Sequence, residues 1–593
     1  MSNDQTLNLI QQISQHSQFS PEKTALIFAQ KFLTYRQLEE KSNQIANLLL
    51  ELQVGVGDRV ALLLPNCPEF IISYLGILKS GAVVVAVNST LTQPEVSFIL
   101  ADSQAKVVVT TSELQDRILV DTLPDLTQVL LTDDESSSQQ NLAARMAQAS
   151  SLFQALEMPD EAPALILYTS GTTGTPKGAV LSFGCLAVTS GIYVQHLQLT
   201  VADKVLLCLP AFHSYGLTTT LNPTLYAGAI LVMLPKFEIE SVLRTIIEQE
   251  ITTFYGVPTL YTLLLNQATA EQLQPVQRYI SAGATLPVEI AQQWYNKFEV
   301  IVNEGYGLTE GSLTCFNQRP LDKLGSVGQP FEGIQVRVVD EQGKIVQTGQ
   351  LGEVVISGPN LFLGYWNQPE ATAEAIQDGW FYTGDIGRAD EDGYFYIVDR
   401  RKDMVIVAGE NVYPSEVENR LYHHEAVAEV AVYGIPADIF GEQVRADIIL
   451  KLGHQPTEDE IIEFCRPALA PYKLPSVVKF VETLPKGKTG KILKRVLQEQ
   501  ANLETQISND IATKAISHST IKESQAVYKQ TDATHIPEFW PAVDPYHVYD
   551  IFLYNRMTGD QERADKYRLA IEKTVADKVV LEIGPGQRAN LTR

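Results

Sequence analysis

The first third of the chain alternates short apolar runs with amphipathic stretches. Residues 59–64 (RVALLL) form an apolar run typical of a buried strand, and residues 68–78 then place apolar side chains at helical spacing. Residues 82–87 and 106–110 are again strand-like, with a helical pattern over 94–101 between them. Strand–helix–strand order is typical of parallel sheets covered by helices, so we expect an α/β fold here.

The pattern changes near residue 400, at the charged run 399–403. Short strands are predicted over 427–433 and 444–451, with compact helices between them. One of these helices should begin with a capping box formed by Thr457 and Glu460. We expect a small α+β unit here, followed by a polar stretch with the composition of a linker.

Composition narrows the possible functions. Lys and Arg total 45 against 70 Asp and Glu, a net charge of −25, which disfavours nucleic acid as a partner because a polyanion is repelled. The longest apolar runs, such as 228–235, are far shorter than the ~20 residues of a membrane span. The polar N-terminus does not resemble a signal peptide, and the cysteines have no metal or redox spacing. We expect a cytoplasmic enzyme or binding protein.

The segment 168–178, YTSGTTGTPKG, follows a strand-like run over 164–167. Small hydroxyl and glycine residues leave backbone N–H groups free to surround an anion, and Lys177 adds positive charge. A helix from Ala179 onward would direct its positive end to the same place. A mobile polar loop is the alternative, but it does not explain the closing lysine. The predicted phosphate-binding residues are Thr169, Ser170, Gly171, Thr172, Thr173, Gly174 and Lys177.

Further motifs follow in a fixed order. They are FHSYG (212–216), SAGA (281–284), GYGLTE (305–310), YTGD (382–385), DRRKD (399–403), GENVYP (409–414) and GK (490–491). Together with the loop, this series resembles the adenylate-forming ligases, which include acyl-CoA synthetases, peptide-synthetase adenylation domains and luciferases. The resemblance covers residues from about 20 to 498. It implies an α/β AMP-binding domain with mixed or parallel sheets (1–401), a small mobile α+β lid domain (402–498), a linker (499–536) and a tail (537–593).

The resemblance assigns the nucleoside of ATP to several of these motifs. Tyr306 offers a flat face for adenine, while Asp385 can accept both ribose hydroxyls and Arg400 can donate to the same sugar. Taken singly, Asp385 fits a turn and Arg400 a solvated charge, but the matching series favours binding. The predicted nucleotide-binding residues beyond the loop are Gly283, Ala284, Tyr306, Gly307, Asp385, Arg400 and Gly409.

The resemblance also assigns the chemistry. Glu310 would hold Mg²⁺, and Thr309 would donate its hydroxyl to the α-phosphate. Lys491, at the end of PKGKTGK, would contact the substrate carboxylate and the α-phosphate, and the other lysines of this loop are expected to be solvated. Because Lys491 lies ~90 residues beyond the expected hinge at Lys402, the lid must rotate to deliver or withdraw it. A second orientation would present residues 408–411 to an incoming thiol.

His213 stands where amino-acid-activating relatives have an aspartate that pairs with the substrate ammonium. A buried ammonium without a counter-charge is costly, so a plain carboxylic acid is favoured. We expect His213 to line or gate the acyl pocket rather than act as a base, with a structural histidine as the alternative. Gly283, Gly305 and Gly307 would leave room for a slender acyl chain. The residues that make up the motifs resemble those of fatty acyl-CoA ligases.

The sequence therefore predicts an acid–thiol ligase with Lys491, Thr309, Glu310 and His213 as its catalytic residues. The ligase would use ATP, Mg²⁺ and CoA or phosphopantetheine. Its candidate partners are an acyl carrier protein or further domains of a multidomain synthase. One alternative is an adenylation module for an amino or aryl acid in a nonribosomal peptide or polyketide assembly line. A non-catalytic acyl- or nucleotide-binding module is the other, against which the intact site residues argue.

The tail resembles the entrance of a protein-arginine-methyltransferase-like domain. Residues 579–586 are strand-like and end in a glycine turn that would hold S-adenosylmethionine, although Arg588 stands where a third glycine is common. An ordinary strand-to-turn junction is the alternative. Only seven residues follow Gly586. We expect a partial Rossmann-like segment, truncated or vestigial, with S-adenosylmethionine as cofactor only if the tail belongs to a longer chain.

Overall fold

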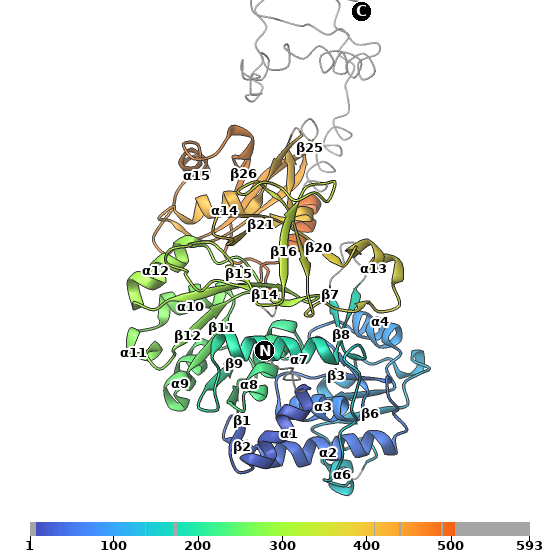
Figure 1. The fold of residues 1–593 in the computed structure, drawn as a ribbon. Coiled ribbons are helices and arrows are strands. Elements are labelled where there is room, and N and C mark those ends of the chain that lie inside the picture. The colour runs from blue at the N-terminus through green and yellow to red at the C-terminus, as the bar shows by residue number, and fades with distance from the viewer. Residues whose placement is uncertain are drawn as a thin grey trace, which may run out of the picture. The chain divides into compact units, whose positions relative to one another are not determined.

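The computed structural model describes residues 8–136, 138–169, 176–407, 409–437, 441–487 and 490–504. The predictions for Ser170–Gly174, for most of the linker and for the whole methyltransferase-like tail lie outside the described residues. The described part contains four sheets (Figure 1). None of its helices combines the length and the apolar character that a bilayer span requires.

The first sheet has seven strands in the order β18-β8-β7-β4-β3-β5-β6. They are β3 (Arg59–Leu63), β4 (Val83–Ala86), β5 (Val107–Thr110), β6 (Gln128–Leu131), β7 (Pro163–Thr169), β8 (Lys177–Ser182) and β18 (Gly364–Tyr365). Its helices are α3 (Pro68–Lys79), α4 (Gln93–Ser103), α5 (Ser112–Gln115) and α6 (Leu142–Gln148). Strands β3, β4 and β5 are parallel and connected through α3 and α4, which confirms the strand–helix–strand pattern predicted between residues 59 and 110.

The helix predicted from Ala179 onward is wrong in its start. Residues 177–182 form β8, which pairs antiparallel with β7, and helix α7 (Phe183–Leu197) begins only afterwards. The apolar residues 179–181 are buried in the sheet, where packing on both faces favours a strand. The small-residue loop thus connects two antiparallel strands, and the N-terminus of α7 lies at the other end of β8.

The second sheet has nine strands in the order β15-β14-β13-β12-β11-β9-β10-β1-β2. They are β1 (Thr24–Phe28), β2 (Lys31–Thr34), β9 (Lys204–Leu207), β10 (Ile230–Met233), β11 (Thr253–Gly256), β12 (Arg278–Ser281), β13 (Val302–Leu308), β14 (Ser312–Phe316) and β15 (Gln329–Pro330). Strands β9 to β13 and β1 are parallel to their neighbours, except at the antiparallel edges. Because parallel strands end at one edge, the motifs that follow β9, β12 and β13 meet there.

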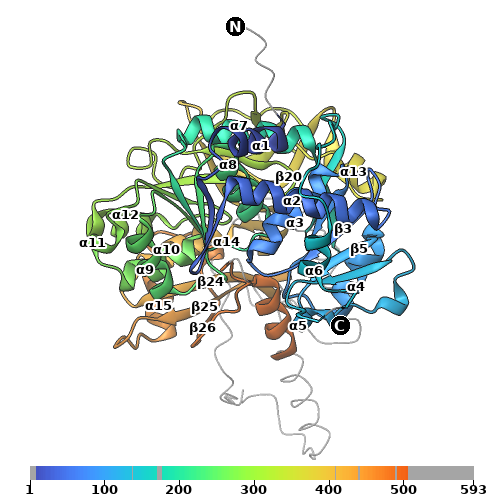
Figure 2. The same cartoon turned by 90° about the horizontal axis from the view of Figure 1, so that it is seen from below.

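Helices cover this sheet and join it to the first. They are α1 (Leu9–Phe19), α2 (Tyr35–Glu51), a π-helix η2 (Tyr215–Leu221), α8 (Asn222–Tyr226), α9 (Ile239–Gln249), α10 (Pro258–Gln267), α11 (Ala270–Leu273) and α12 (Val288–Phe298). Helices α1, α2 and α3 pack side by side (Figures 1 and 2). Most buried apolar side chains of both sheets belong to one continuous core, which gives the strand ends a rigid base.

A third sheet is antiparallel and carries the YTGD and DRRKD motifs. Its strands are β16 (Gln335–Val339), β17 (Gly352–Ser357), β19 (Ile376–Gln377), β20 (Trp380–Ala389) and β21 (Phe395–Arg400), with helix α13 (Pro369–Ala375) beside β19. Its pairing places Asp385 of β20 directly opposite Arg400 of β21. The chain then passes through one 3₁₀ turn, η3 (Arg401–Asp403), into the fourth sheet.

The fourth sheet forms the lid. Its strands are β22 (Val405–Val407), β23 (Glu410–Val412), β24 (Val427–Ala437), β25 (Gly441–Leu450) and β26 (Val477–Phe480), and its helices are α14 (Pro414–Tyr422), α15 (Glu458–Cys465) and residues 494–504. The capping box of Thr457 and Glu460 is confirmed. The last helix continues past residue 498, where we expected the linker to begin, because Leu497 and Ala501 are buried against the lid sheet.

Candidate active site

The predicted motifs gather at one edge of the nine-stranded sheet. Strands β12 and β13 place Ser281 opposite Glu304, so the loop at Gly283 lies beside Tyr306. The third sheet brings Asp385 to the same point, where the Tyr306 hydroxyl donates a hydrogen bond to Asp385 Oδ2 at 2.5 Å. Segments that are distant in sequence therefore converge on one group of polar side chains.

Asp385 and Arg400 form the centre of this group. Arg400 Nε lies 3.0 Å from Asp385 Oδ1, and Asp385 is only 3% exposed. The Asp385 amide donates to Thr383 Oγ1 at 3.0 Å, which fixes the turn before it. One carboxylate oxygen faces Tyr306 and the other faces Arg400, and each retains a further lone pair. The carboxylate is held rigidly and can still accept two hydroxyl groups.

Lys177, Tyr365 and Glu310 form a second group from three separate segments. The Tyr365 hydroxyl donates to Glu310 Oε1 at 3.0 Å, and the Lys177 amine lies 5.1 Å from the centre of the Tyr365 ring. Burial raises the pKa of Glu310 even though Tyr365 donates to it. A cation near this carboxylate would relieve the cost of its buried charge, so Glu310 fits the predicted Mg²⁺ role.

A bound Mg²⁺ would need ligands from the substrate as well as from the protein. No cluster of three or more His, Cys, Asp or Glu residues in the described ranges is placed to hold a metal ion. Mg²⁺ is usually bound through one or two carboxylates together with substrate phosphates, an arrangement that needs only Glu310 from this group. Thr309 precedes Glu310, and its hydroxyl lies 3.5 Å from that of Ser214.

Sequence reasoning missed Tyr365. This residue belongs to the two-residue strand β18, which pairs with β8 so that Tyr365 lies opposite Ala179. Its partners Lys177 and Glu310 are far away in sequence, so local periodicity gives no sign of the contact. The only local signal is an aromatic residue directly after Gly364, in a segment otherwise typical of a turn.

His213 lies just before the π-helix and is half-buried. The Tyr215 backbone N–H donates to His213 Nδ1 at 3.2 Å, so the ring proton is assigned to Nε2. Burial and the nearby positive charge of Lys491 lower the pKa of His213 to about 4. A histidine that is neutral near pH 7, with Nδ1 occupied, is suited to lining a pocket rather than to general acid catalysis.

Lys491 reaches this region from the lid. The preceding residue docks on helix α10, where the Thr259 hydroxyl donates to the Gly490 carbonyl at 2.8 Å. Gly490 has φ +78°, and a Cβ there would come within 3.0 Å of Val257 Cγ2. Both the backbone conformation and the close approach favour glycine at this position. The lid and the large domain belong to one compact unit, so this contact is part of the described structure.

Nearby charges act on the Lys491 amine in opposite directions. Burial and the positive charge of Arg400 lower the pKa of Lys491 to about 8, while Asp403 and Asp385 attract the charged amine. The side chain keeps contact with solvent. The charges of Asp385 and Arg400 act on the amine, which is therefore within electrostatic range of the predicted ribose site.

Some predicted positions are not brought into this group. Gly409 lies at the exposed turn between β22 and β23, with φ +87° and open space around the position of a Cβ. Ala284 is exposed beside Gly283. The loop residues Ser170, Gly171, Thr172, Thr173 and Gly174 lie outside the described residues, but Thr169 and Lys177, which flank them, are paired in the β7–β8 hairpin.

Two smaller expectations are wrong. A Cβ on Gly307 would lie 2.3 Å from the Ser312 carbonyl oxygen, and one on Gly305 would lie 2.9 Å from Leu313 Cδ1. These two glycines allow β14 to pack closely on β13 and leave no room for an acyl chain. Lys486 is not a solvated neighbour of Lys491, because it is ion-paired within the lid.

Comparison with known proteins identifies related chains. The family model described as AMP-binding enzyme matches residues 13–366, and the one described as AMP-binding enzyme C-terminal domain matches residues 416–491. The long-chain-fatty-acid–CoA ligase of Bacillus subtilis is 36% identical over 519 residues, covering 81% of this chain and 92% of that protein. Feruloyl-CoA synthase from an Amycolatopsis species is 35% identical, covering 81% and 96%.

Solved structures agree with these matches. The crystal structure of ATP-bound MatB from Rhodopseudomonas palustris superposes with a TM-score of 0.78 at 34% identity, covering 84% of this chain and 99% of that chain. The anthranilate CoA ligase AuaEII in complex with anthranoyl-AMP has a TM-score of 0.79 at 31% identity, covering 84% and 98%.

We predict that the Lys491 amine titrates near pH 8 in the protein without bound nucleotide. It is charged below this pH and loses its charge above it, whereas an ordinary lysine stays charged to about pH 10.4. Competitive labelling with a limiting amine reagent across this pH range, followed by peptide mass spectrometry, measures the midpoint. A midpoint close to the ordinary lysine value would contradict the placement of Lys491 beside Arg400.

Proposed function

Because the chain belongs to the family of AMP-binding enzymes, we propose that it activates a fatty acid and transfers the acyl group to a thiol. The reaction class is ATP-dependent acid–thiol ligation. A carboxylate oxygen bonds to the α-phosphorus of ATP as the bond to pyrophosphate breaks, giving an acyl-adenylate. A thiolate then bonds to the acyl carbon as the bond to AMP breaks, giving a thioester.

The observation that carries this proposal is the docking of the loop of Lys491 on the large domain, where the Thr259 hydroxyl donates to the Gly490 carbonyl. Lys491 belongs to the lid, whereas Asp385 and Arg400, whose charges act on its amine, belong to the third sheet of the large domain. In the proposed first step, the Lys491 amine stabilises the negative charge that develops between the carboxylate and the α-phosphate. A cation on a separate, hinged body can be withdrawn once the adenylate has formed.

The remaining polar groups have complementary proposed roles. Asp385 and Arg400 hold the ribose, and Tyr306, fixed by its hydrogen bond to Asp385, presents its ring beside Gly283 for adenine. Lys177 and the loop before it bind the phosphates, and Thr309 donates to the α-phosphate. Glu310, oriented by Tyr365, would hold Mg²⁺, which neutralises phosphate charge when bound.

His213 supports a plain carboxylic acid as substrate. The ring is neutral and half-buried, and the charge of Lys491 acts on it, which supports a position near the reacting carboxylate. It supplies no negative charge for a substrate ammonium, so binding an amino acid would leave that charge unpaired. The similarity to a fatty-acid ligase makes a fatty acid the first candidate, and the similarity to feruloyl-CoA synthase makes an aryl acid the second.

CoA is the acceptor that the names of the relatives specify, and we propose that this chain uses it. An acyl carrier protein would offer the same phosphopantetheine thiol and is the alternative acceptor. We further propose that residues 1–401 and 402–498 act as separate bodies joined at Lys402. The resemblance of the tail to a methyltransferase that binds S-adenosylmethionine stays a prediction from sequence alone, because residues 537–593 lie outside the described residues.

Replacing Lys491 separates the two steps. We expect Lys491→Ala to lower carboxylate-dependent ATP–pyrophosphate exchange by about 10²–10³, because a preorganised donor to the developing charge is lost. Thioester formation from preformed acyl-adenylate should largely survive. Lys451→Ala, which removes an exposed lysine of the lid, is the control and should leave both steps unchanged. An equal loss of both steps in Lys491→Ala would contradict the proposal.

A panel of acids tests the substrate class. We expect AMP release with CoA to be fastest for octanoate or palmitate, slower for benzoate and ferulate, and about 10–100-fold weaker for amino acids, whose ammonium would be buried unpaired. His213→Asp should shift the preference towards amino acids, because it supplies the missing counter-charge. Preference of the natural chain for amino acids would favour the adenylation module, and no AMP release with any acid would favour a binding module.

A further inference from the structure

The N-terminus of helix α14 in the lid is capped by a residue of the large domain, on the other side of the hinge. Its own N-cap residue, Tyr413, provides no capping side chain. Instead Asp399 Oδ2 accepts the backbone N–H of Ser415 at 2.9 Å, and the Ser415 hydroxyl donates to the Val398 carbonyl. Asp399 belongs to β21 of the large domain, before Lys402. The lid helix therefore receives its capping carboxylate from the large domain, in addition to Glu416 in its own first turn.

Lys494 contacts the same face of α14. Its amine lies 2.8 Å from Glu418 Oε1, and both side chains are mostly buried. Ser415 and Glu418 are three residues apart and lie on one face of the helix, so Asp399 and Lys494 each bond to that face. Burial works against the charge of Lys494, yet its pKa is raised, because Glu418, Asp399 and Asp403 attract the charge.

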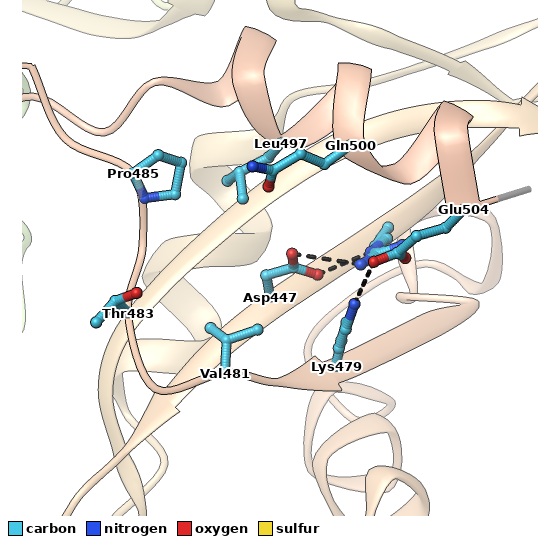
Figure 3. A pocket seen from close by; sticks show the side chains of 9 residues that line it. Asp447, Lys479, Val481, Thr483, Pro485, Leu497, Gln500 and Glu504 are labelled. Carbon is cyan, nitrogen blue, oxygen red and sulfur yellow. Dashed lines mark hydrogen bonds and ion pairs between the residues drawn. The ribbon is translucent and has the colours of Figure 1, made fainter.

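The helix that carries Lys494 is firmly part of the lid. Leu497 packs into the lid core at one end of the helix. At the other end, Glu504 pairs with Arg445 at 3.1 Å and with Lys479, beside a cavity of about 200 Å³ (Figure 3). Residues 494–504 are thus fixed to β25 and β26, and any rotation of the lid carries Lys494 with it.

We propose that Asp399 and Lys494 are positioning residues that hold the lid where Lys491 faces the nucleotide-binding residues. When the chain turns at Lys402, Asp399 stays with β21, whereas α14 and Lys494 move with the lid. Rotation must break the cap on α14 and separate Lys494 from Asp399. The cap, together with the attraction between the charges of Asp399 and Lys494, thereby favours the orientation for adenylation over the orientation for thioester formation. This inference rests on the proposed function, since only a two-step enzyme needs both orientations.

A second ion pair in the same loop provides a matched control. Lys486 lies 2.6 Å from Glu429, with both side chains largely buried, five residues before Lys491. Lys486 and Glu429 both belong to the lid, on the same side of the hinge. Breaking this pair removes an ion pair inside the lid, as Lys494→Met does with Glu418, but leaves Asp399 untouched, so it separates a general weakening of the lid from control of the lid orientation.

The test compares the two half-reactions in the full-length Lys494→Met variant. At saturating substrate, ATP–pyrophosphate exchange reports the first orientation, and thioester formation from preformed acyl-adenylate reports the second. We expect the ratio of the first rate to the second to fall about tenfold, the size of one lost charge-assisted interaction, because the attraction of Lys494 to Asp399 across the hinge is removed. The ratio follows the relative population of the two orientations, so the change is expected whichever one dominates. Lys494→Arg should restore the ratio, and Lys486→Met should leave it unchanged.

Each result distinguishes the inference from the proposed function. An unchanged ratio in Lys494→Met, including an equal fall of both rates, overturns the positioning role while the proposed function stands. If the natural chain performs neither half-reaction, the proposed function itself fails. Should Lys494→Met not fold, Asp399→Asn is the second variant, because it keeps an oxygen to accept the Ser415 N–H and removes the charge that attracts Lys494. It should lower the ratio too, and an unchanged ratio would again overturn the inference.

Discussion

The positive charge of Lys491 beside that of Arg400 is the interaction on which the rest of the site depends. Burial lowers the pKa of Lys491, and repulsion between the two positive charges lowers it further. Asp385 and Asp403 offset only part of the cost. A bound polyphosphate would supply the missing negative charge, so closure of the lid, which carries Lys491, should be more favourable on an occupied site than on an empty one.

Rotation of the lid would move the positive charge of Lys491 while the remaining groups of the site stay in place. Tyr306 and Gly283 are fixed by neighbouring parallel strands, and Asp385 and Arg400 by a pair of antiparallel strands. Only Lys491 belongs to the lid. A short turn at residues 401–403 joins the two bodies, and the contact of Asp399 with α14 crosses it. A rotation at this turn would move Lys491 and leave the other groups of the site in place.

Local sequence patterns predicted the parts of the fold that depend on local interactions. The strands and helices between residues 59 and 110 follow from periodicity, and the capping box at Thr457 follows from two side chains one turn apart. Packing across the chain decided the rest. Residues 179–181 form a strand because β7 and β18 pair with them. Strand β14 occupies the space that a side chain at Gly307 would need.

The same distinction applies to the site. The order of the motifs predicted which segments meet, and the structure brings Tyr306, Asp385 and Arg400 into contact and docks the loop of Lys491 on α10. Tyr365 could not be predicted from its neighbours in sequence, because its role comes from pairing with a distant strand.

Glu289 of α12 and His423, just after α14, face each other across the two domains with 3.8 Å between carboxylate and imidazole. A covalent link between these two positions would hold the lid in its present orientation. The most direct test of a rotating lid is to replace both by cysteine, join them with a short cleavable bismaleimide, and measure the two half-reactions before and after cleavage. The account predicts that the linked protein keeps ATP–pyrophosphate exchange, loses thioester formation and regains it on cleavage, whereas unimpaired thioester formation in the linked protein would contradict it.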